Sequence, residues 1–320
     1  MSELDQGEVG GEPVVSGGDT TEVLSSENKR SISLRLWLKR TGSYRPKAVT
    51  ARSLIFPAAA ISEGRELKEE LSLLEEYRPV ALVTGSTSGI GESVARRFVQ
   101  EGYNVVLHSR NSGDKGRSLA AELESASYIQ ADLARESDRR RLIHDAVGLW
   151  GRLDVLVNNA GLSGVIPHAD LHAATSEIWH ALYEVNVVAP FHLIAEAEAA
   201  LRNAAQHGRT ACVVNISSHA GVRPKGASIP YAATKAALNH VTRLLALSLA
   251  PAIRVNAVAP GLVDTPLTAD WTAAQDLWRT RAPMRRPASP EDIAQAVMML
   301  VQSDYLTGEI LLSDGGLNLT

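Results

Sequence analysis

From Val80 onward, short β-rich runs alternate regularly with helical stretches, and this alternation constrains the fold most strongly. The seven expected strands cover residues 80–84, 104–108, 127–130, 154–158, 211–216, 253–258 and 309–312. The six expected helices cover residues 89–101, 114–124, 135–149, 175–205, 230–249 and 290–302. Strands that alternate with helices form a parallel sheet covered on both faces. The sequence therefore predicts one α/β domain over residues 79–320, built on a doubly wound, parallel, seven-stranded, Rossmann-like sheet.

Residues 1–78 differ in composition and are expected to form an N-terminal extension. Residues 1–27 hold acidic side chains and no basic ones, whereas residues 28–54 hold Lys and Arg but no Asp or Glu. Such blocks of like charge are typical of a disordered tail. A partner-binding tail is the alternative interpretation. A short helix is predicted over residues 62–77 by the apolar stripe of Leu67, Leu71 and Leu74.

Composition excludes several classes of function. The net charge of −4 gives no basic footprint for nucleic acid, and no apolar run reaches the roughly 18 residues that span a membrane. The only cysteine, Cys212, rules out an internal disulfide and suits a reducing compartment, so we expect a cytoplasmic protein. His168 and His172 flank Asp170, but they lack a third obvious ligand, and no metal site is predicted.

The first expected strand runs directly into a glycine-rich turn. Glycine stands at positions 85, 89 and 91, in the sequence Thr-Gly-Ser-Thr-Ser-Gly-Ile-Gly. Glycine lets the backbone turn tightly and approach a pyrophosphate, while the helix N-terminus supplies N–H groups and positive potential. We therefore predict a dinucleotide-binding turn formed by Gly85, Thr87, Ser88, Gly89, Ile90 and Gly91.

The second expected strand ends at Ser109 and Arg110. A site that prefers NAD usually has Asp or Glu near this position, bonded to the ribose 2′-hydroxyl. A carboxylate would repel a 2′-phosphate, whereas an arginine can bind one through two nitrogens. The neutral serine and the arginine therefore favour NADP(H) over NAD(H).

Tyr231 and Lys235 lie four residues apart in an expected helix, so their side chains share one face. A phenol ordinarily titrates near ~10. A neighbouring cation favours phenolate, so we expect Lys235 to lower the pKa of Tyr231. The pair is thus a candidate for general acid–base chemistry.

With these pieces in place, the chain resembles the short-chain dehydrogenase/reductase family over about residues 79–320. The resemblance rests on an ordered set of motifs: Thr84–Gly91, Asp132–Leu133, Asn158–Gly161, Asn186, Asn215–Ser218, Tyr231–Lys235, Pro260–Thr265 and Asp314–Gly316. It implies that Asp132 and Leu133 contact adenine. It also implies that further cofactor contacts come from Asn159, Ala160, Gly161, Tyr231, Lys235, Pro260, Gly261, Val263 and Thr265, the last four beside the nicotinamide amide.

The resemblance also implies a catalytic set. Ser218 would bond the substrate oxygen, Tyr231 would exchange a proton with it, and Lys235 would hold the ribose hydroxyls. Asn186 would hold a water that links Lys235 to solvent. The family spacing to the tyrosine selects Ser218 over Ser217, and because side chains alternate at a strand end, only one serine should face the cofactor.

The implied function is an NADP(H)-dependent oxidoreductase that transfers a hydride between nicotinamide and a carbonyl or secondary alcohol. The alternatives are a reductase of 3-oxoacyl thioesters and a cofactor-binding sensor without turnover. Specificity is expected from loops 162–175, 219–230 and 265–289, the last resembling the family's substrate lid. The substrate is expected to be a small molecule. The family's pairing of the helices at 175–205 and 230–249 implies a homodimer or homotetramer.

Overall fold

The computed structural model describes residues 78–206 and 210–320, and a single parallel sheet organises them. Its strands are β1 (Val80–Val83), β2 (Asn104–Ser109), β3 (Ala126–Gln130), β4 (Val155–Asn158), β5 (Ala211–Ile216), β6 (Ile253–Pro260) and β7 (Ile310–Ser313). They lie in the order β3-β2-β1-β4-β5-β6-β7, and every neighbouring pair is parallel. The predicted fold class is therefore confirmed. The expected extension, with its short helix at 62–77, falls outside the described residues except for Arg78.

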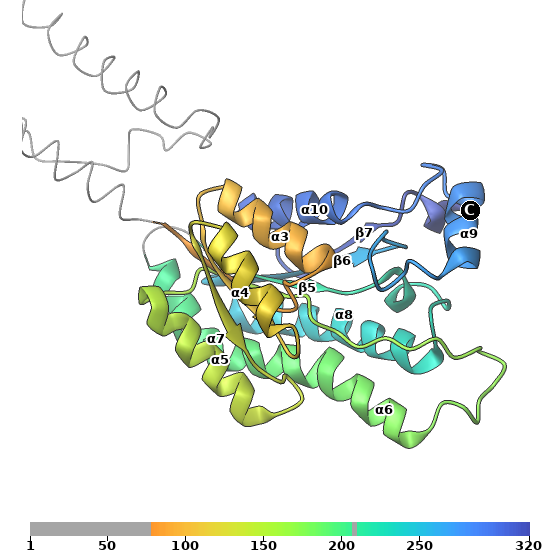
Figure 1. The fold of residues 1–320 in the computed structure, drawn as a ribbon, viewed down its shortest axis with the longest axis horizontal. Coiled ribbons are helices and arrows are strands. Elements are labelled where there is room, and N and C mark those ends of the chain that lie inside the picture. The colour runs from red at the N-terminus through yellow and green to blue at the C-terminus, as the bar shows by residue number, and fades with distance from the viewer. Residues whose placement is uncertain (1–77, 207–209) are drawn as a thin grey trace, which may run out of the picture. The chain divides into compact units, whose positions relative to one another are not determined.

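Helices cover both faces of this sheet (Figure 1). They are α3 (Gly89–Gln100), α4 (Gly113–Glu122), α5 (Glu136–Trp150), α6 (Ser176–Tyr183), α7 (Ala189–Ala205), α8 (Ile229–Leu249), α9 (Thr272–Arg281) and α10 (Pro290–Gln302). Side chains of α5, α7 and α8 pack in one apolar core, and those of α3, α4 and α10 pack in a second core. The two cores lie on opposite faces of the sheet because side chains alternate along a strand. In β1, Val80 and Leu82 join the first core, whereas Ala81 and Val83 join the second.

Two elements differ from the sequence prediction. The helix expected over 175–205 consists of α6, a π-helical turn (Glu184–Val188) and α7. The expected loop at 265–289 contains the helix α9, none of whose residues is fully buried. Its ten residues give only a short apolar pattern, Ala273, Ala274, Leu277 and Trp278. None of the helices in the described ranges is long and apolar enough to cross a bilayer.

Candidate active site

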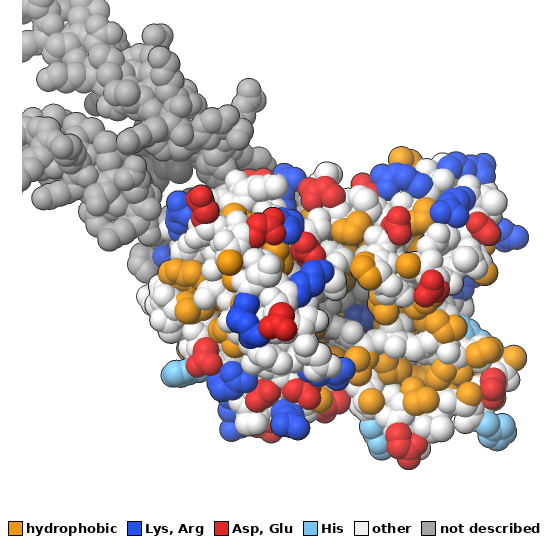
Figure 2. Space-filling view, in the orientation of Figure 1, with side chains coloured by type: hydrophobic (Ala, Val, Ile, Leu, Met, Phe, Trp, Pro, Cys, Tyr) orange, Lys and Arg blue, Asp and Glu red, His pale blue; other side chains and the backbone are white. Residues whose placement is uncertain are grey.

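A cavity of about 1030 Å³ opens at the carboxyl ends of the strands. Figure 2 shows this face of the molecule hollowed, with hydrophobic side chains gathered beside the hollow. The predicted site residues that line the cavity are Gly85, Thr87, Ser88, Gly89, Ile90, Ser109, Arg110, Asn159, Gly161, Ser218, Tyr231, Lys235, Pro260, Gly261, Val263 and Thr265. Gly91, Asp132, Leu133, Ala160 and Asn186 are not part of its wall.

The glycine-rich turn has the geometry of a phosphate cradle. Gly85 and Gly89 adopt positive φ values of 65° and 55°, which favour glycine. A Cβ on Gly91 would lie 2.3 Å from the Gly85 oxygen and 2.4 Å from Asn159 Nδ2, so no side chain fits there. The turn leads into the N-terminus of α3, whose free N–H groups favour an anion. The cradle thus fits the pyrophosphate of a dinucleotide.

The segment after β4 holds the glycine-rich turn in place through hydrogen bonds. The Asn159 amide nitrogen donates to the Thr84 oxygen at 2.8 Å and to the Gly85 oxygen at 3.1 Å. The Thr84 hydroxyl accepts from the backbone N–H of both Asn159 and Ala160, each at 3.0 Å. The polar groups of this segment therefore bind the turn itself, and Ala160 acts through its backbone.

His108 is a further part of the cofactor side, and motif matching missed it. The Gly85 N–H donates to its Nδ1 at 3.1 Å, so the ring proton is on Nε2, which donates to the Ala131 oxygen at 3.0 Å. Burial lowers the pKa of His108 to about 4, and the ring is therefore neutral at physiological pH. This histidine joins the turn after β1 to the ends of β2 and β3.

The end of β2 contains the pair expected to select the cofactor. The Ser109 hydroxyl lies 2.8 Å from the Tyr128 hydroxyl and accepts from the Ser112 N–H at 3.2 Å. Arg110 is exposed at the cavity, and its carbonyl accepts from Gln130. No carboxylate stands at either position, so nothing in this pair opposes a 2′-phosphate.

Asp132 and Leu133 follow β3, outside the wall of the cavity. The Asp132 carboxylate accepts from the Ala134 N–H at 3.1 Å. Leu133 is buried, and its carbonyl accepts from Arg139 at 2.7 Å. Their contact with adenine stays a prediction.

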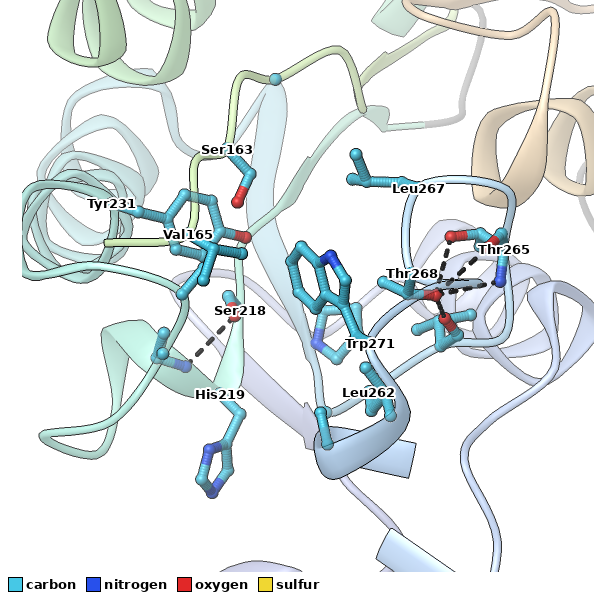
Figure 3. A pocket seen from close by; sticks show the side chains of 18 of the residues that line it. Ser163, Val165, Ser218, His219, Tyr231, Leu262, Thr265, Leu267, Thr268 and Trp271 are labelled. Atoms are coloured by element: carbon cyan, nitrogen blue, oxygen red, sulfur yellow. Dashed lines mark hydrogen bonds between the residues drawn. The ribbon is translucent and has the colours of Figure 1, made fainter. Parts of the chain in front are cut away.

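The two candidate serines point to different partners. The buried Ser217 donates to the Lys235 carbonyl at 3.3 Å, on the backbone of α8. The Ser218 hydroxyl accepts from the Ala220 N–H at 3.1 Å, and Tyr231 interacts with this hydroxyl (Figure 3). The geometry thus associates Ser218, and not Ser217, with the tyrosine.

The pKa of Tyr231 shifts in the direction opposite to our expectation. Burial raises it, and the hydrogen bond with Ser218 only partly offsets this effect. Lys235 donates to the Ile216 carbonyl at 2.9 Å, its nitrogen lies 5.8 Å from the centre of the tyrosine ring, and burial lowers its own pKa to about 8. The predicted lowering of the tyrosine pKa by Lys235 is therefore wrong for this arrangement, in which burial raises the pKa and only the Ser218 hydrogen bond lowers it.

Asn186 lies in the π-helical turn, beside Lys235 rather than on the cavity wall. Its Oδ1 accepts from the Leu162 N–H at 2.8 Å, and its Nδ2 donates to the Leu162 oxygen at 2.9 Å and to the Thr234 hydroxyl at 3.1 Å. A Cβ on Gly161 would lie 3.2 Å from Asn186 Oδ1 and 3.6 Å from Lys235 Nζ. Asn186 therefore fixes the loop that separates it from the lysine.

The segment after β6 forms another wall of the cavity. The Thr268 hydroxyl donates to the Val263 oxygen at 2.5 Å and accepts from the Thr265 N–H at 3.2 Å (Figure 3). A Cβ on Gly261 would lie 2.9 Å from the Trp278 indole, so α9 packs directly against this segment. Thr268 is a further residue that motif matching missed, because its role depends on a local turn.

The substrate side of the cavity is largely apolar. Its wall includes Val165, Leu267, Trp271 and Trp278, from the loops predicted to set specificity, and Leu262 from the segment after β6. Figure 3 shows Trp271 between the Tyr231 side and the Thr265–Thr268 turn. Such a surface suits a bulky organic substrate.

Comparison with known proteins identifies the class. A family model described as enoyl-(acyl carrier protein) reductase matches residues 85–318. A ketoacyl reductase named for the granaticin polyketide synthase of Streptomyces violaceoruber is 49% identical over 248 residues, which are 75% of this chain and 96% of that protein.

Solved structures agree with this match. A 3-ketoacyl-(acyl-carrier-protein) reductase from Brucella melitensis, complexed with NADH, has a TM-score of 0.69 and 33% identity, covering 74% of this chain and 97% of its own. The Pseudomonas aeruginosa RhlG/NADP complex also has a TM-score of 0.69, with 32% identity over 75% of this chain and 96% of its own.

The chain belongs to the short-chain dehydrogenase/reductase family. It is an oxidoreductase that acts on CH–OH and C=O groups and uses a nicotinamide cofactor. The enzyme interpretation is thereby confirmed over the sensor without turnover.

Proposed function

We propose that this protein is an NADPH-dependent ketone reductase whose catalytic set is Ser218, Tyr231 and Lys235, supported by Asn186. The observation that carries the proposal is the convergence of Ser218, Tyr231 and Lys235 on one cavity with the glycine-rich turn. When bound, the nicotinamide supplies the hydride. The raised pKa of Tyr231 keeps its phenol protonated at neutral pH, as a proton donor to a carbonyl requires.

Each side chain has a distinct task in this proposal. Ser218 donates a hydrogen bond to the substrate oxygen, and Tyr231 gives that oxygen a proton. Lys235 holds the ribose hydroxyls with its ammonium group. Asn186 fixes the Leu162 segment beside Lys235, which supports the relay of protons that the family resemblance implies.

Replacing the phenol hydroxyl tests this assignment. Tyr231→Phe should lower kcat by about 10²–10⁴-fold, because general-acid help contributes that much, while NADPH affinity stays within a few-fold. The measurements are NADPH oxidation with a panel of aliphatic and aromatic ketones, and NADPH fluorescence on binding. Tyr183→Phe on α6, at an exposed tyrosine, is the matched control. Normal turnover by Tyr231→Phe would refute the proposal.

The preference for NADP(H) rests on Ser109 and Arg110 at the end of β2. Arg110 is exposed at the cavity, and neither residue is acidic. Ser109→Asp combined with Arg110→Ala should reverse the preference toward NAD(H). The check is the ratio of kcat/KM for the two cofactors, and an unchanged ratio would contradict the assignment.

A 3-oxoacyl thioester is the second candidate substrate class. It is favoured by the 49% identity to a protein named as a ketoacyl reductase. An acetoacetyl thioester and 2-pentanone share the reacting ketone but differ in the thioester. A kcat/KM at least tenfold higher for the thioester would support this class, and equal values would favour a reductase of simple ketones.

A further inference from the structure

Arg139 is a buried cation that joins two parts of the site. It lies on α5, with 4% of its side chain exposed. Its Nη1 donates to the Leu133 carbonyl at 2.7 Å and to Glu184 Oε1 at 2.5 Å. Leu133 follows β3, and Glu184 is the first residue of the π-helical turn. A single guanidinium nitrogen therefore connects the loop after β3 to this turn.

The register of this turn decides where Asn186 points. The Ala189 N–H donates to the Glu184 oxygen, the i to i+5 bond of a π-helical turn. One residue corresponds to about 100° of rotation around a helix. Relaxation to an ordinary α-helix would therefore turn Asn186 away from its partners. Because π-helical turns are rare, we expect tertiary contacts to stabilise this one.

Asn186 connects the π-helical turn to residues beside Lys235. Both polar atoms of its amide bind the backbone of Leu162, and its nitrogen also binds Thr234, the neighbour of Lys235. The Leu162 segment lines the cavity. The position of one wall beside Lys235 thus depends on the π-helical turn.

We propose that Arg139 and Glu184 are a positioning pair, which holds the π-helical turn in the register that presents Asn186 to Leu162 and Thr234. This inference rests on the proposed function, since it assigns the pair an effect on turnover through Asn186. Neither side chain lines the cavity. Nε of Arg139 has no hydrogen-bond partner among residues 78–206 and 210–320, so the loss of Glu184 would leave the buried guanidinium poorly satisfied.

Turnover of a matched set of variants tests the pair. Glu184→Ala should lower kcat by about 10- to 100-fold, the scale expected for a misplaced wall of an active site. NADPH affinity should change little. Glu184→Gln keeps an acceptor for Arg139 and should stay within about threefold of the parent. In Glu184→Asp the side chain is too short to reach Arg139, so kcat should also fall. This variant replaces Glu184→Ala if that protein does not fold.

The matched control breaks a different ion pair of α5, made with the helix that follows the π-helical turn. Arg140 of α5 binds Glu196 of α7 at 3.2 Å, and Glu196 is as exposed as Glu184, at 36%. Glu196→Ala should keep the parent kcat. Adding Glu184→Ala to Asn186→Ala should cause no further loss, because the pair acts through Asn186. Additive losses, or an equal loss in Glu196→Ala, would overturn the proposal.

Hydrogen exchange gives a readout that does not require turnover. The amide of Leu162 should exchange faster in Glu184→Ala and in Asn186→Ala than in the parent or in Glu196→Ala. Unchanged exchange at Leu162 in Glu184→Ala would overturn the positioning role. A normal kcat in Asn186→Ala would instead refute the proposed function of Asn186, and the exchange result would still decide whether the pair sets the register.

Discussion

The buried side chain of His108 makes the stability of the folded protein depend on pH. Its two ring nitrogens bind the Gly85 N–H and the Ala131 carbonyl, so protonation would place a donor against the Gly85 donor. Burial lowers its pKa from 6.5 to about 4. Between these values the unfolded chain binds more protons than the folded one, and stability must therefore fall as the pH falls.

We predict that the free energy of unfolding drops by about 2 kcal/mol from pH 7 to pH 5 on account of His108. The loss should be complete near pH 4, where the folded protein also takes up the proton. Urea unfolding at each pH measures it. His108→Asn removes the titrating ring and should flatten this dependence. An identical loss in both proteins would show that other groups cause it.

The sequence predicted which motif residues come together, while their roles stay predictions. Ser218 follows β5, and Tyr231 and Lys235 lie on α8; all three line the same cavity. The pKa direction of Tyr231 was predicted wrongly, since helix spacing reveals the neighbouring cation but not the burial. His108 and Thr268 were missed because their contacts are made across the fold or in a local turn.

At the scale of elements, the approach of α3 to the segment after β4 determines the cofactor cradle. Gly91→Ala would put a methyl group 2.3 Å from the Gly85 oxygen and 2.4 Å from Asn159 Nδ2. The turn and the Asn159 segment would have to separate. We predict that NADPH affinity falls at least about tenfold, measured by NADPH fluorescence, since one misplaced cradle contact costs on the order of 1.4 kcal/mol.

Gly148→Ala is the matched control, because it makes the same change in a helix, at a glycine with no atom within 4 Å of the added Cβ. It should leave affinity unchanged and stabilise α5 slightly. Equal affinities for the Gly91→Ala variant and the parent would mean that the cradle does not hold the cofactor.

Alternation of strands and helices predicted the elements but not their irregularities. All seven strands were predicted, and their boundaries differ only slightly, because buried parallel strands are short apolar runs. The π-helical turn was missed, since the sequence of 175–205 predicts a helix without showing which hydrogen bonds its backbone makes. Helix α9 was missed because its ten residues give only a short apolar pattern, and the packing of Trp278 against Gly261 cannot be seen in the sequence.

At the scale of the whole molecule, exposed apolar side chains on α7 and α8 suggest contact with another copy. They are Phe191, Ile229, Leu244 and Leu247, the last 83% exposed. Isolated apolar residues are common on surfaces, but here they lie on the two helices that the family resemblance assigns to subunit pairing. A homodimer or homotetramer stays our prediction.

Leu247→Glu should therefore shift the protein toward the monomer, because a carboxylate would be buried in an apolar contact. Light scattering coupled to size-exclusion chromatography over a range of concentrations measures the shift. Leu149→Glu, at an exposed leucine of α5, should not change the mass. A monomeric parent protein would contradict the predicted assembly.

Because Cys212 in β5 is buried, a reporter group can be attached to the protein at one chosen position. Cys212 is its only cysteine, and burial raises the pKa of that thiol to about 11, so maleimides should leave the parent unlabelled at neutral pH. A cysteine placed at the exposed Leu267 or Met284, on either side of α9, would then be the single reactive thiol. A fluorophore there could report binding at the substrate side without removal of any native residue from the core.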